Sequence, residues 1–112
     1  MADLRTQPRV AVHLRLIVRH AGFEGHGHTE NLSERGAMIS VDIDPALTPG
    51  DPLDLEFELP HLGPVTIPAT VRWVSAVLPG MTGIEFDPPV LPELLAYIAS
   101  LIDRRMDEAE GF

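Results

Sequence analysis

The strongest constraint on the fold is a strict alternation of apolar and polar residues that recurs along the chain. Its clearest instance is LDLEFEL, residues 53–59, in which acidic residues separate the apolar ones. The apolar positions are Leu53, Leu55, Phe57 and Leu59. Successive side chains of a β-strand point to opposite faces of the sheet, so this pattern predicts a strand with one buried and one solvated face.

Further runs of this kind, together with a polar segment at residues 26–31 that we interpret as a short strand, predict a mainly β fold with six short strands. We expect these strands at residues 10–19, 26–31, 36–43, 53–59, 65–74 and 84–87. In the fifth run we expect Trp73 on the inner face together with Val71. Pro68 in that run indicates an edge position or a bulge, because proline cannot donate a hydrogen bond to a neighbouring strand. Turn-forming Pro, Gly and Asp residues separate the runs.

The periodicity changes near residue 90. Apolar residues then follow the i, i+3, i+4, i+7 spacing of an amphipathic helix, namely Leu91, Leu94, Leu95, Ile98 and Leu101. We expect a helix over residues 91–107, beginning near Pro92, since proline suits the first helical turn. Six antiparallel strands and one C-terminal helix favour a small closed β-barrel, because closure leaves no exposed strand edge. The 112 residues would form one domain, with a flexible N-terminal segment (1–9) and a barrel (10–87) before the helix.

Composition excludes several classes of protein. Hydrophobic residues make up 45% of the chain, which is typical of a folded globular domain. No apolar run approaches the roughly 18 residues of a membrane helix, and the N-terminus shows no apolar signal-peptide segment. The absence of cysteine excludes disulfides and thiolate metal sites. We therefore expect a cytoplasmic protein without membrane insertion.

The net charge of −9 argues against general binding to DNA, RNA or anionic lipid. The charge is uneven, however: residues 1–36 hold five arginines against four acidic residues, and the other thirteen acidic residues lie in residues 37–112. An anionic ligand should therefore bind locally, near the first third of the chain. An oligonucleotide-binding barrel is also disfavoured, because one Trp, one Tyr and four Phe provide few stacking surfaces.

Two pairs of arginines have the spacing R-x-x-x-R. Arg15 and Arg19 lie within a regular strand, an even number of residues apart, so we expect both on its solvated outer face. Arg5 and Arg9, in RTQPR, precede that strand in a segment without periodicity. Two guanidinium groups in such a segment can wrap around a ligand and become ordered with it, or they can belong to a disordered tail.

A second group of polar residues precedes the third apolar run. In NLSERG, residues 31–36, Asn31, Ser33 and Gly36 have the spacing N-x-S-x-x-G. Taken alone, they fit an Asx or Ser turn in which the glycine supplies a positive φ or a bulge. The combination of this motif with the earlier arginine pair, inside a six-stranded pattern, is more specific than either motif.

This combination resembles the signature of the PilZ domain family, which has both motifs at these two places. The likeness continues through GAMIS, LEFELP, ATVRWV and GIEF, so it covers most of the chain. The resemblance implies a binding module without catalytic activity or cofactor. Its implied ligand is the bacterial second messenger cyclic di-GMP. It also implies an unidentified protein partner in the control of motility, attachment or exopolysaccharide.

The resemblance assigns the arginine pair to the ligand. Arg5 and Arg9 would bind phosphate oxygens or the O6 and N7 atoms of guanine, and would stack on a base. On binding, the N-terminal segment would close over the ligand and change the surface offered to a partner. Leu4 stands where some family members have a further arginine, which favours one ligand per domain.

The resemblance also assigns roles to the second motif. Asn31 would contact a base edge, and Ser33 would donate to a phosphate or base acceptor. Gly36 would let the ligand approach the backbone, since it has no Cβ. Arg35 would be an auxiliary cation beside the pocket.

No metal or catalytic site is predicted. His26 and His28 would share one face of a strand, but a Zn²⁺ site needs three or four protein ligands and no third is apparent. Ser33 lacks the surrounding motif of a catalytic nucleophile.

An alternative keeps the barrel without nucleotide binding. The acidic strand face formed by Asp54, Glu56 and Glu58, together with the acidic C-terminal tail, would then dock a basic protein partner.

Overall fold

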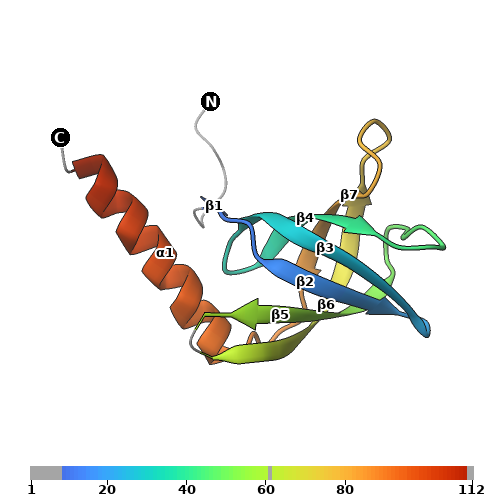
Figure 1. The fold of residues 1–112 in the computed structure, drawn as a ribbon, viewed down its shortest axis with the longest axis horizontal. Helices are drawn as coiled ribbons and strands as arrows, with labels where there is room; N and C mark the ends of the chain where they lie inside the picture. The colour runs from blue at the N-terminus through green and yellow to red at the C-terminus, as the bar shows by residue number, and fades with distance from the viewer. Residues whose placement is uncertain (1–8, 61, 111–112) are drawn as a thin grey trace.

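The computed structural model describes residues 9–60 and 62–110, and shows seven strands followed by one helix in these ranges. In chain order they are β1 (Val10–Ala11), β2 (Arg15–His20), β3 (Phe23–Leu32), β4 (Gly36–Asp42), β5 (Pro52–Leu59), β6 (Gly63–Val74), β7 (Met81–Phe86) and α1 (Pro92–Glu110). The strands form one antiparallel sheet that curves into a barrel, with α1 at one end (Figure 1).

The barrel closes through the pairing of β3 with β4. Around the ring the strands follow the order β3, β2, β5, β6, β7, β4, and β4 pairs again with β3. The short β1 is an addition that pairs with the end of β3. The predicted six-stranded antiparallel barrel with one C-terminal helix is confirmed. In the part of the chain that the structure describes, no helix has both the length and the apolar character needed to cross a membrane.

The strands β3 and β7 each begin three residues earlier than the sequence pattern predicted. β3 begins at Phe23 rather than at residue 26, because a two-residue turn, Ala21 and Gly22, joins it directly to β2. Both turn residues have positive φ, 51° and 85°, as required by the tight hairpin turns that match the twist of the strands. β7 begins at Met81 rather than at residue 84.

The first long strand is interrupted at residues 12–14, where a fully buried threonine of β3 takes over part of the hydrogen bonding. The Thr29 hydroxyl oxygen accepts a hydrogen bond from the Leu14 N–H at 2.9 Å and donates to the Val12 carbonyl. The Thr29 N–H donates to the Leu14 carbonyl at 2.9 Å. A register shift between Thr29 and Asn31 marks a β-bulge at the same place. The chain therefore bends into two elements, β1 and β2, which both pair with β3.

The prediction that Trp73 lies on the inner face is wrong. The side chains of β6 alternate as predicted up to Val71, which is buried, but the register with β7 shifts between Val71 and Trp73. The extra residue, Arg72, reverses the alternation, so Trp73 turns outward and is 44% exposed. Because β6 lies between β5 and β7, Pro68 is neither on an edge strand nor in the bulge. The missing N–H of Pro68 is tolerated because the pairing of β6 with β7 ends at the next residue, Ala69.

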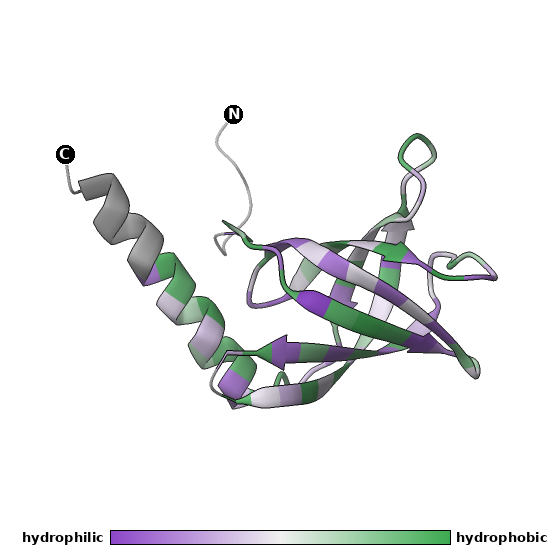
Figure 2. Ribbon diagram, viewed as in Figure 1, coloured by the Kyte–Doolittle hydropathy of each residue, from purple (hydrophilic) through white to green (hydrophobic). Residues whose placement is uncertain are grey.

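The strands alternate between hydrophobic and hydrophilic residues, and their inner faces form one core (Figure 2). Phe57 of β5 and Phe86 of β7 meet edge to face inside it, with ring centroids 6.3 Å apart. α1 packs against one end of the barrel with Leu94 and Ile98, which are both fully buried. The helix then leads away from the barrel and ends at Glu110, beyond the predicted end at residue 107 (Figure 1).

Replacing Thr29 with valine should destabilise the fold by about 1–3 kcal/mol, because the Leu14 N–H would lose its buried acceptor. Thr29→Ser retains the hydroxyl and should cost less. Thr66→Val, at an exposed position of β6, is the matched control and should change the free energy of unfolding by less than about 0.5 kcal/mol. Urea denaturation measures all three. Equal stability of the Thr29→Val and Thr66→Val variants would contradict the role given to Thr29.

Candidate functional site

The N-x-S-x-x-G motif forms the turn that joins β3 to β4. The Ser33 N–H donates to the Gly36 carbonyl at 2.8 Å. The Ser33 hydroxyl oxygen accepts from the backbone N–H groups of Arg35 and Gly36, each at 3.3 Å. Ser33 is buried, and its side chain stabilises the turn by local hydrogen bonds to the backbone.

Gly36 is required by the close approach of β7. A Cβ atom at this position would lie 2.1 Å from the carbonyl oxygen of Ile84 and 3.1 Å from the Cα of Glu85. The neighbouring Arg35 carbonyl accepts a hydrogen bond from the Phe86 N–H at 2.8 Å, which holds the turn against β7. Gly36 does not have a positive φ, so the reason for a glycine here is steric.

Arg9 and Asn31 are in direct contact. β1 pairs with β3, with Ala11 opposite Asn31, and this pairing brings Arg9 alongside the motif. The Arg9 Nη1 group donates to the Asn31 Oδ1 atom at 3.1 Å. The same oxygen accepts from the Met38 N–H at 3.3 Å, which ties Asn31 to β4. Arg9 of the arginine pair and Asn31 of the N-x-S-x-x-G motif are therefore in contact in the structure.

A cavity of about 210 Å³ lies at this place. Four of the predicted site residues line it: Arg9, Ser33, Arg35 and Gly36. Asn31 is not part of the lining but is hydrogen-bonded to Arg9. The prediction for Arg5 lies outside the described residues.

The cavity concentrates positive charge in a chain whose net charge is −9. Arg72 of β6 lines it together with Arg9 and Arg35, and we call it the arginine cavity. Arg72 forms an ion pair with Glu85 of β7. Among residues 9–60 and 62–103, the guanidinium groups of Arg9 and Arg35 have no ion-pair partner. As far as the described side chains are concerned, two cations are thus available to an anionic ligand.

The sequence pattern did not indicate three further residues of this cavity, Arg72, Trp73 and Glu85. The Trp73 indole lies directly over Gly83 of β7, where a Cβ atom would be only 2.1 Å from the indole Nε1 atom. An exposed indole beside guanidinium groups is a surface on which a base can stack. The alternation of β6 pointed Trp73 inward, and only the glycine opposite it, Gly83, hints that the ring lies on the outer side.

The second arginine pair does not contribute to the cavity. Arg15 and Arg19 are exposed on the outer face of β2, as predicted. Arg19 forms ion pairs with Glu24 at 3.2 Å and Glu56 at 3.0 Å. The hydrogen bond that Arg19 donates to Glu56 is the main cause that raises the pKa of Arg19 above its usual value. These two arginines belong to a solvated strand face.

The histidines of β3 have carboxylate neighbours. The His28 Nε2 atom lies 2.9 Å from a Glu30 carboxylate oxygen, and the His26 Nε2 atom lies 3.4 Å from one of Glu24. Within the ranges that the structure covers, no group of three or more His, Asp or Glu side chains is arranged to hold a metal ion.

Known proteins are similar to this chain over most of its length. Residues 3–103 match the family model described as the PilZ domain. The structure is similar to the Bacillus subtilis inhibitor of motility MotI/DgrA, with a TM-score of 0.74 and 17% identity over 95% of this chain and 53% of that chain. It is also similar to the PilZ domain of CeSA from a cellulose-synthesizing bacterium, with a TM-score of 0.67 and 18% identity over 88% of this chain and 98% of that one. No curated protein matches the chain.

Because the sequence identities are low, these structural similarities show a shared fold and nothing more. The chain spans about half the length of the MotI/DgrA chain that it resembles. The family match is independent of them and covers both candidate motifs. The chain belongs to the PilZ domain family.

Proposed function

We propose that this protein is a cytoplasmic receptor for cyclic di-GMP that signals to a protein partner. PilZ domains are in general receptor or adaptor modules for this nucleotide and are not enzymes. One observation on this chain carries the proposal. Arg9, Arg35 and Trp73 line a single cavity beside the motif turn, although the chain as a whole is acidic.

The chemistry of the ligand suits these side chains. Cyclic di-GMP presents two phosphates and two guanines, and a guanidinium group can pair with phosphate oxygens or with guanine O6 and N7. Arg9 uses one donor group in its contact with Asn31, so several of its five N–H donors remain for the ligand. Arg35 supplies a second cation at the same cavity. A phosphate there would meet two guanidinium groups.

The size of the arginine cavity suggests that only part of the ligand enters it. Its volume of about 210 Å³ is below the roughly 300–1,000 Å³ typical of sites that enclose a whole small molecule. We therefore assign one guanine and its phosphate to the arginine cavity, with the base stacked on Trp73. Arg5 would bind the other half of the ligand as the N-terminal segment closes over it. This closure would change the surface that a partner contacts.

The neighbouring structures suggest the process that is controlled. One is named as an inhibitor of motility, and the other is a domain of CeSA from a cellulose-synthesizing bacterium. We propose motility, surface attachment or exopolysaccharide production as the regulated output of this receptor.

A partner-binding module without nucleotide binding is less well supported. Its docking surface would be the acidic outer face of β5, formed by Asp54, Glu56 and Glu58. Glu56 is engaged by Arg19 at 3.0 Å, so part of this negative charge is neutralised within the domain. That engagement weakens the face as a site for a basic partner.

The contacts of Gly36 predict a structural effect on mutation. Gly36→Ala should lower the free energy of unfolding by about 1–3 kcal/mol, because the new Cβ would displace the backbone of β7. Ser40→Ala, in the same strand, is the control and should be nearly neutral. Chemical denaturation without nucleotide measures both. If Gly36→Ala kept full stability and lost only nucleotide binding, the glycine would serve ligand approach instead.

The central prediction concerns Arg9. Isothermal titration calorimetry should detect saturable binding of cyclic di-GMP to the intact chain. Arg9→Ala should weaken this binding by about 2 kcal/mol, or roughly 30-fold, because a charge-assisted contact is lost. Arg15→Ala removes the same charge from the solvated face of β2 and should have little effect. Equal affinities of the two variants would contradict the proposed site, and no heat from the intact chain would contradict the proposed function.

A further inference from the structure

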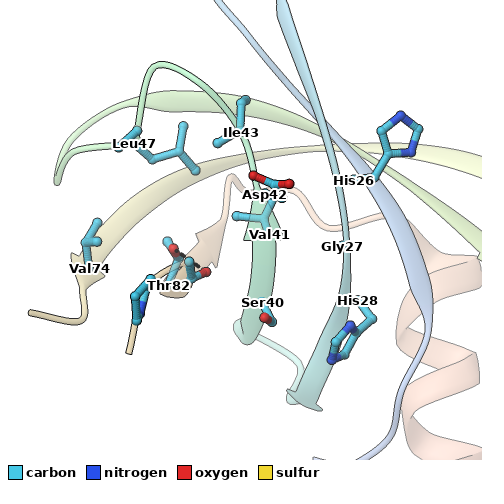
Figure 3. A pocket seen from close by; sticks show the side chains of 13 residues that line it. His26, Gly27, His28, Ser40, Val41, Asp42, Ile43, Leu47, Val74 and Thr82 are labelled. Carbon is cyan, nitrogen blue, oxygen red and sulfur yellow. Dashed lines mark hydrogen bonds between the residues drawn. The ribbon is translucent and has the colours of Figure 1, made fainter. Parts of the chain in front are cut away.

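A second and larger cavity, of about 480 Å³, lies between the β4–β5 loop and the β6–β7 loop. Apolar side chains form much of its lining, and we call it the apolar cavity: Val41, Ile43, Leu47 and Val74. Figure 3 shows Leu47 and Ile43 above Val41, with Val74 and Thr82 beside them, and His26 directed away from this group. These loops lie at the end of the barrel opposite α1 (Figure 1).

The apolar part of this cavity offers space for a hydrophobic group. Val41 and Leu47, which line it, are only 6% and 5% exposed. Thr82 is almost fully buried, and its hydroxyl group donates to the Gly80 carbonyl at 3.2 Å. Because this hydroxyl already has a partner, an aliphatic or aromatic side chain is the group that the space fits best.

The apolar surface continues onto the β6–β7 loop. This loop projects from the barrel (Figure 1), and Val77 and Leu78 at its tip are 83% and 55% exposed. Pro79 and Gly80 of the same loop line the apolar cavity. Large apolar side chains exposed next to an apolar hollow are typical of protein interaction sites.

Negative charge lies beside the apolar cavity. Asp42, the last residue of β4, lines the cavity, and Asp44 follows two residues later in the β4–β5 loop; both are exposed. Neither carboxylate has a hydrogen-bond or ion-pair partner among the residues whose side chains the structure describes. No arginine lines the cavity, and the chain contains no lysine. A positive group on a partner would therefore find carboxylates free to pair with it.

We propose that the apolar cavity and the loop tip form the docking site for a protein segment that carries a large apolar side chain next to Lys or Arg. The apolar side chain enters the cavity, and the basic group pairs with Asp42 or Asp44. This inference rests on the proposed function in one respect, that the receptor has a protein partner. A second copy of this chain is a poor occupant, because it would bring another net charge of −9 to an acidic rim.

Neighbouring residues of β6 and β7 line the two cavities, which would give nucleotide binding a route to the partner. Trp73 and Gly83 line the arginine cavity, whereas the next residues along the same strands, Val74 and Thr82, line the apolar cavity. Adjacent residues of a strand point to opposite faces. A ligand that displaces β6 or β7 at Trp73 therefore also displaces the wall of the docking site.

The test uses a display library of random 12-residue peptides, selected on the intact chain without nucleotide. Selected peptides should contain a large apolar residue flanked by Lys or Arg. Fluorescence anisotropy of a labelled selected peptide then measures its affinity for surface variants. Leu78→Ser should weaken binding about 10-fold and Asp42→Asn about 3–10-fold. Asp54→Asn, an exposed acidic residue on β5, is the charge-matched control and should leave the affinity unchanged.

Several results would overturn the docking site. The selection could enrich no peptide, or only peptides without basic residues. The selected peptide could also bind the Asp42→Asn and Asp54→Asn variants with equal affinity. Sedimentation that shows a dimer that dissociates in the Leu78→Ser variant would assign the surface to a second copy.

Calorimetry with cyclic di-GMP on Asp42→Asn separates this inference from the proposed function. We expect Asp42→Asn to retain nucleotide binding while its peptide binding is weakened about 3–10-fold. Peptide binding by a chain that binds no nucleotide would reject only the receptor role.

Discussion

Both the barrel and the candidate site depend on the pairing of β3 with β4. This pairing closes the ring of six strands, and the turn that connects the two strands is the N-x-S-x-x-G motif itself. Ser33 stabilises the turn with its hydroxyl group, and Gly36 leaves room for the backbone of β7. The same residues thus complete the fold and form one side of the arginine cavity. Their sequence pattern therefore reflects a structural requirement of the fold.

The position of the charges decides which anions the domain can accept. With a net charge of −9, the protein repels extended polyanions. At physiological salt, charges beyond about 8 Å are largely screened, so a small anion in the arginine cavity interacts mainly with Arg9 and Arg35. A compact dinucleotide with two phosphates satisfies both conditions. The neighbouring Trp73 adds a surface for a base, which inorganic phosphate cannot use.

Most of the fold could be predicted because burial on one face of a strand leaves a period-two pattern, as in residues 53–59. The structure departs from this pattern where the register shifts. The bulge at Arg72 turns Trp73 outward, and alternation carries no mark of such an inserted residue. The buried Thr29 stands in a polar segment, so nothing local distinguished it from a solvated residue. The contact of Arg9 depends on the register of β1 with β3, which periodicity does not define.

The most direct measurement of the central claim uses the single tryptophan of the chain. Because Trp73 lines the arginine cavity and is 44% exposed, its fluorescence reports on the surroundings of that cavity. Cyclic di-GMP should change the Trp73 emission saturably, with the midpoint that calorimetry gives for binding. Emission that stays constant while calorimetry shows saturation would place the nucleotide elsewhere and would contradict the account.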